Sequence, residues 1–102
     1  MKAAVLTTYN KVEWKEVEKP ECKPGEVLFK VTYGRICGSD QHLYKGEFHP
    51  RTKTPMVMGH EFGGIVAEVG EGVTGWEIGE KVAPDPIIWC GQCPACKKGH
   101  YP

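Results

Sequence analysis

Three cysteines stand close together near the end of the sequence, at positions 90, 93 and 96. Thiolates separated by two residues can bind one soft metal ion, because a tight turn brings their sulfurs within coordination distance. A tetrahedral zinc site needs four ligands, and His100 offers only a weak fourth. The spacing therefore predicts a metal site at Cys90, Cys93 and Cys96, in a loop that begins near residue 90.

Two other uses of this cysteine motif do not match the sequence. A thioredoxin-type redox pair would use Cys93 and Cys96, but it needs a βαβ pattern that the surrounding residues do not have. A ferredoxin-type iron–sulfur motif needs a further cysteine four residues after Cys96, where the sequence has His100. Zinc is the metal that the motif favours.

A second group of residues is spread over the middle of the chain. Cys37 follows a strongly apolar stretch, and His60 and Glu61 come more than twenty residues later. Cysteine, histidine and glutamate together suit a catalytic zinc, which keeps one position open for water or substrate. Asp40 could hold the second ring nitrogen of His60, as carboxylates commonly do beside metal-binding histidines.

Each of these residues also has a plain structural explanation. Cys37 alone would more often be a small core residue at the end of a strand. Ser39 and Asp40 are ordinary helix N-caps, and His42 would more often lie on a helix surface. It is the combination with His60 that favours a metal site.

The elements that must position these residues read as mostly β. Strands are expected over residues 2–8, 12–20, 26–37 and 63–73, with a turn and another short strand over 77–84. One or two helical turns are expected over 38–46, with Ser39 or Asp40 as N-cap and Gly46 as the stop. Residues 90–102 show no periodicity and are expected to form a loop. Many short strands with glycine turns predict a small barrel or sandwich.

Length and composition fit one small folded domain. The chain has 102 residues, of which 40% are hydrophobic. Thirteen basic residues balance thirteen acidic ones, which argues against a nucleic acid or a membrane surface as partner. Since neither a spanning segment nor a secretory leader is visible, we expect a cytoplasmic protein with cysteines as thiols or metal ligands.

The motifs together resemble the zinc-dependent medium-chain alcohol dehydrogenases. "GHEFGGIVAEVGEGV" is similar to the family's zinc signature, "CGSDQH" to the segment with its first zinc ligand, and "CGQCPAC" to its structural-zinc lobe. The residues that match the zinc signature are Gly59, His60, Glu61, Gly64, Gly70 and Val73. The three motifs occur in the family's order and span the whole chain.

The resemblance implies a mostly β GroES-like barrel with short helical segments, the catalytic domain of these enzymes. Cys37 and His60 would bind catalytic zinc, and "CGSD" resembles the polyol, butanediol and threonine branches, where Glu61 would also be a ligand. The parent would oxidise a secondary alcohol or polyol by hydride transfer to NAD or NADP. Ser39 would accept the hydroxyl proton and pass it towards His42.

Residues 1–102 are therefore expected to be a truncated GroES-like catalytic domain. The fourth structural cysteine of the family would fall just past residue 102. The nicotinamide cofactor would be bound by a separate nucleotide-binding domain, so no cofactor-binding residue is expected here. We expect the isolated chain to be inactive and the parent to be a homo-oligomer.

Three alternatives compete with the zinc dehydrogenase. A zinc-free quinone reductase relative would lack Cys37 and the cysteine motif, which are present. A chaperonin-type binding module would carry a mobile apolar loop and no metal ligands. A small zinc-binding interaction module would need only the cysteine loop and would have no catalytic activity.

Overall fold

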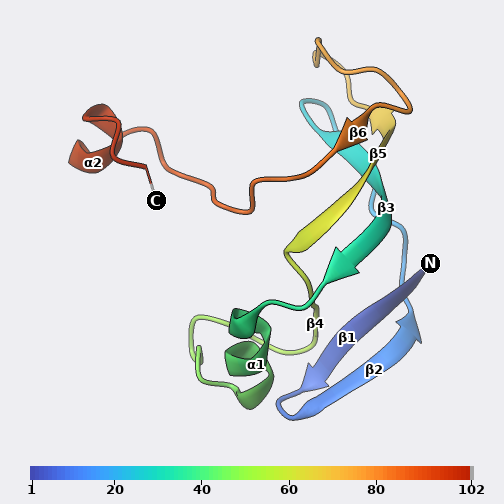
Figure 1. Cartoon of the computed structure of the whole chain (residues 1–102), viewed down its shortest axis with the longest axis vertical. Coiled ribbons are helices and arrows are strands. Elements are labelled where there is room, and N and C mark those ends of the chain that lie inside the picture. Colours follow the sequence, from blue (N-terminus) through green and yellow to red (C-terminus); the bar gives the residue numbers. More distant parts are fainter. Residues whose placement is uncertain (102) are drawn as a thin grey trace.

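The computed structural model describes residues 1–101, and within this range the chain forms two three-stranded antiparallel sheets and two short helices (Figure 1). In chain order the elements are β1 (Lys2–Thr8), β2 (Lys11–Glu16), β3 (Val27–Arg35), α1 (Gly38–Lys45), β4 (Met56–Val57), β5 (Glu61–Val69), β6 (Lys81–Val82) and α2 (Pro94–Lys97). The prediction of a mostly β fold with short helical segments is confirmed.

The two sheets have the strand orders β2-β1-β4 and β3-β5-β6. Three residues of β1 are buried, namely Ala3, Val5 and Leu6, and Leu6 is fully buried together with Val66 of β5. The hairpin between β1 and β2 turns at Asn10, whose φ of 64° is one that asparagine tolerates better than most residues. The second strand ends at Glu16 rather than Pro20, since the proline lies beyond the last paired residue.

The pairing of β3 with β5 positions the middle group of polar residues. Because the two strands are antiparallel, the end of β3 lies beside the start of β5, and Arg35 is directly opposite Glu61. Gly64 permits this close pairing, since a Cβ there would lie 2.2 Å from the Lys30 carbonyl oxygen. β5 thus begins at Glu61, not at residue 63 as predicted, because its first two residues pair with β3.

Helix α1 follows β3 after a break at Ile36 and Cys37. Its N-cap is Cys37, not Ser39 or Asp40 as predicted, because Asp40 at the third helical position accepts a hydrogen bond from the Cys37 backbone N–H at 2.8 Å. Gly46 ends the helix with a φ of 79°, as the sequence indicated.

The turn between β1 and β2 supports the far end of α1. The Tyr44 hydroxyl donates to the Asn10 carbonyl at 2.7 Å, and the Asn10 N–H donates to the Tyr44 carbonyl at 2.8 Å. The ring of Tyr9 lies where a side chain on Gly46 would be, 2.9 Å from the position of its Cβ. The hairpin and the helix therefore fix each other's position.

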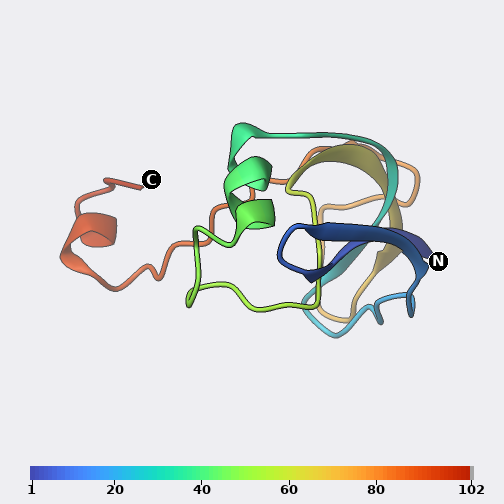
Figure 2. The same ribbon diagram turned by 90° about the horizontal axis from the view of Figure 1, so that it is seen from below.

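Residues 83–101 lead away from the sheets and include α2 near their end, as both views show (Figures 1 and 2). Helix α2 was predicted as loop; it is too short to show periodicity, and it forms because Pro94 starts it and the Cys93 sulfur accepts from the Cys96 N–H. The two-residue strand β4 was also missed. Among residues 1–101, no helix is long and apolar enough to cross a bilayer.

Candidate metal centres and their surroundings

The structure brings Cys37, His60 and Glu61 together beside the end of β3. Their candidate ligand atoms all lie within 4.8 Å of one another. Cys37 lies two residues after the end of β3, and His60 lies one residue before the start of β5. Because the two strands pair antiparallel, these residues lie close together although more than twenty residues separate them in the sequence. The three donors offer one sulfur, one nitrogen and one carboxylate, a mixed set that suits zinc. Their role as metal ligands stays a prediction.

Asp40 provides a test of whether this group suits a metal. It is buried, and Oδ1 is a buried side-chain oxygen without a hydrogen-bond partner within the described range, lying 3.5 Å from Nδ1 of His60. With the His60 ring proton on Nδ1, directed at Asp40, the lone pair is on Nε2 and is available to a cation. The Ser39 hydroxyl lies 3.3 Å from that Nε2, so it is next to the position that a bound metal would take. The residues therefore fit a zinc ion.

Arg35 is a neighbour of this group that the sequence did not reveal. Its Nε lies 3.6 Å from Oε2 of Glu61, across the β3–β5 pair. The expected strand ends, at residues 37 and 63, did not place the two side by side. Only the register of the sheet shows their contact.

His42 faces outward from α1, and its Nδ1 contacts the carboxylate of Glu47. The hydrogen bond with His42 lowers the pKa of the Glu47 carboxyl from its ordinary value. Glu47 was also missed, because it lies beyond Gly46 and outside the helical spacing. Ser39 and His42 are three residues apart on α1, so they share one face of the helix. Their proton-transfer roles stay predictions.

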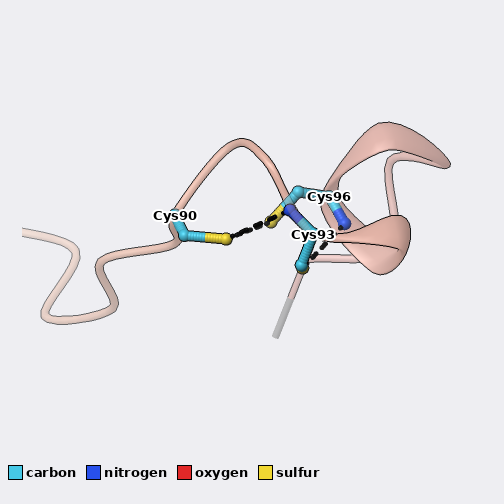
Figure 3. A group of neighbouring side chains, drawn as sticks. All are labelled: Cys90, Cys93 and Cys96. Atoms are coloured by element: carbon cyan, nitrogen blue, oxygen red, sulfur yellow. Dashed lines mark hydrogen bonds between the residues drawn. The ribbon is translucent and has the colours of Figure 1, made fainter.

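The second cysteine group is at the far end of the extended segment (Figure 3). The sulfurs of Cys90, Cys93 and Cys96 lie within 4.8 Å of one another, and those of Cys90 and Cys96 are 3.8 Å apart. The backbone N–H of Cys93 points at the Cys90 sulfur at 3.3 Å, and that of Cys96 points at the Cys93 sulfur at 3.4 Å. His100 is not part of this group within residues 1–101.

The turn around Cys90 favours its thiolate form. Backbone hydrogen bonds from Gln92 and Cys93, with side-chain contacts from Cys93 and Cys96, lower the pKa of the Cys90 thiol to about 7. Cysteine binds a metal as the thiolate. The N–H donors that point at these sulfurs therefore favour binding of a thiophilic metal at this turn.

Comparison with known proteins shows the family of this chain. Residues 23–102 match the family described as "Alcohol dehydrogenase GroES-like domain". The chain belongs to this family. The GroES-like fold expected from the motifs is thereby confirmed.

Two characterised relatives and one solved structure show which members of the GroES-like family are similar. L-threonine 3-dehydrogenase of Pyrococcus abyssi is 48% identical over 88 residues, covering 84% of this chain and 25% of that protein. Sorbitol dehydrogenase of Halalkalibacterium halodurans is 42% identical over 104 residues, covering 99% of this chain and 30% of that protein. The structure described as short chain alcohol dehydrogenase (rspB) of Escherichia coli CFT073, in complex with NADH, is 43% identical with a TM-score of 0.84, over 98% of this chain and 28% of that chain.

These similarities confirm the expected resemblance to the alcohol, polyol and threonine dehydrogenases of the medium-chain type. The relatives are oxidoreductases that act on small molecules. The chain spans less than a third of the length of each of these proteins.

Proposed function

We propose that this chain is the metal-binding catalytic part of a longer zinc-dependent dehydrogenase, which oxidises a secondary alcohol or polyol with NAD or NADP. The observation that carries the proposal is the convergence of Cys37, His60 and Glu61 within 4.8 Å. The relatives support the reaction class, since they include a sorbitol and a threonine dehydrogenase. The nicotinamide would be bound by a domain outside this chain, and the assembled enzyme would be a homo-oligomer.

Cys37, His60 and Glu61 would hold the catalytic zinc, and Asp40 would orient the His60 ring. When bound, the ion would supply Lewis-acid polarisation of the substrate hydroxyl. Ser39, beside Nε2 of His60, would accept the hydroxyl proton, and His42, which is exposed on the same helix, would deliver it to solvent. Glu47 would hold the imidazole of His42 through Nδ1 during that transfer.

Cys90, Cys93 and Cys96 would hold a second, structural zinc. The N–H groups directed at the sulfurs of Cys90 and Cys93 support this role. A fourth ligand is needed to complete a tetrahedral site.

The test is a zinc count and an alcohol oxidation assay with both nicotinamide cofactors on the longer protein. Cys37→Ser and His60→Ala should each remove about one zinc per subunit and most of the activity. Cys22→Ser is the matched control, because Cys22 lies outside both ligand groups and only donates to the Glu26 carbonyl. Full zinc and full activity in His60→Ala would refute the proposal.

A further inference from the structure

Arg35 and Glu61 form an ion pair at the edge of the proposed catalytic zinc site. In sheet register they are directly opposite, and Nε of Arg35 lies 3.6 Å from Oε2 of Glu61. Among the described residues, Arg35 is the cationic side chain within ion-pair distance of this carboxylate. Glu61, a candidate metal ligand, therefore has a positively charged partner on the neighbouring strand.

We propose that Arg35 is a positioning residue for the metal: it holds one oxygen of Glu61, so that the other oxygen is directed at Cys37 and His60. The inference rests on the proposed function, because it takes Glu61 to be a ligand. It makes Glu61 a ligand through one oxygen only, which leaves room for a substrate oxygen at the ion.

In the described chain, the ion pair with Arg35 holds the Glu61 carboxylate near the other candidate ligands and does not compete with them for it. While Glu61 is paired with Arg35, a Glu61 carboxylate oxygen is already within 4.8 Å of the Cys37 and His60 ligand atoms. The ion pair therefore does not draw the carboxylate away from the site. A glutamate side chain has several rotatable bonds, and one that is already restrained loses less freedom when it binds a cation.

The expected effect is modest, since Arg35 is 82% exposed and its pair with Glu61 is longer than a hydrogen bond. Partners of metal ligands typically change metal affinity by about 10- to 100-fold when removed. For a loose, exposed pair we expect a loss at or just below the lower limit of this range, roughly five- to tenfold. Repulsion between the guanidinium and a cation acts in the opposite direction, but it is weakened by exposure and salt.

The experiment measures Co²⁺ and Zn²⁺ binding to the 102-residue chain carrying Cys90→Ser, Cys93→Ser and Cys96→Ser, which leaves one candidate site. Arg35→Met should weaken Zn²⁺ binding roughly five- to tenfold, and Arg35→Lys, which keeps the charge, should weaken it less. Lys30→Met is the matched control, because Lys30 is an exposed lysine on the same strand, opposite Ile65 rather than a ligand. Urea unfolding midpoints of the two Met variants check that folding is equally preserved.

A second measurement asks whether Arg35 acts through Glu61. In a Glu61→Gln background, Arg35→Met should have no further effect on Zn²⁺ affinity, because the carboxylate it holds is gone. Unchanged or tighter binding in Arg35→Met, or the same loss in both backgrounds, would overturn the proposal. A different result would refute the proposed function: Cys37→Ser would leave Co²⁺ binding and the Co²⁺–thiolate absorption band unchanged.

Discussion

Asp40→Asn should weaken metal binding at the Cys37 site although it removes no proposed ligand. In the structure Oδ2 of Asp40 accepts the Cys37 N–H at 2.8 Å, while Oδ1 lies 3.5 Å from Nδ1 of His60. In the variant, the single amide oxygen would keep the Cys37 hydrogen bond and the NH₂ group would face His60. A donor facing Nδ1 favours the tautomer with the proton on Nε2, which has no lone pair left for a metal.

The size of this effect follows from the burial of Asp40, which is only 7% exposed. Removing a group that orients a metal-binding histidine typically weakens metal binding by about 10- to 100-fold. We expect a loss of this size for Zn²⁺, which corresponds to about 1.4–2.8 kcal/mol.

The assay combines Zn²⁺ titration with ¹⁵N chemical shifts of the His60 ring in the metal-free chain, which report the tautomer directly. Asp85→Asn is the matched control, since it makes the same change at a carboxylate that caps the Ile87 N–H, away from the site. If Asp40→Asn kept both the His60 tautomer and the Zn²⁺ affinity of the unaltered chain, the assignment of Asp40 as the orienting group would be wrong.

Three further predictions concern the folded chain. Gly64→Ala should lower the free energy of unfolding by roughly 1–3 kcal/mol, because the new Cβ would lie 2.2 Å from a β3 carbonyl oxygen. Gly38→Ala is the control for urea unfolding, since its Cβ would meet open space and should not lower that free energy. Glu47 has its pKa lowered by the hydrogen bond with His42, so its charge stabilises the fold above pH 4.5 and this contribution is lost as the pH falls through the lowered value. Glu47→Gln should therefore show a smaller fall in urea midpoint between pH 7 and about pH 3.5, and an equal fall in both proteins would contradict the pairing. Removing zinc with a chelator should raise amide exchange in residues 90–101 and leave β1 unchanged; protection of both segments without metal would argue against a zinc-stabilised turn.

Much of the fold could be predicted because local patterns determine it. The strand at residues 2–8 and the glycine stop of α1 were predicted correctly, since a short run of strand-forming residues before a turn and the φ of 79° at Gly46 depend on nearby residues. The start of β5 was wrong by two residues because strand pairing, not composition, extends it to Glu61. Helix α2 was missed because four residues are too few to show a helical period.

The sequence by itself determined which chemical groups are available and how the nearest ones are spaced. Cys90, Cys93 and Cys96 are so close in the chain that one tight turn is enough to bring their sulfurs together. The same holds for the short spacing that places Ser39 and His42 on one face of a helix.

Only the tertiary structure decided which distant groups meet. Cys37 and His60 come together because β3 and β5 pair in one register, and a shift by one residue would turn every side chain of β5 to the other face. The same register places Arg35 against Glu61, which no local pattern indicated. Pairing between strands is set by hydrophobic packing and by close backbone approach at Gly64, and these are properties of the whole fold rather than of any one segment.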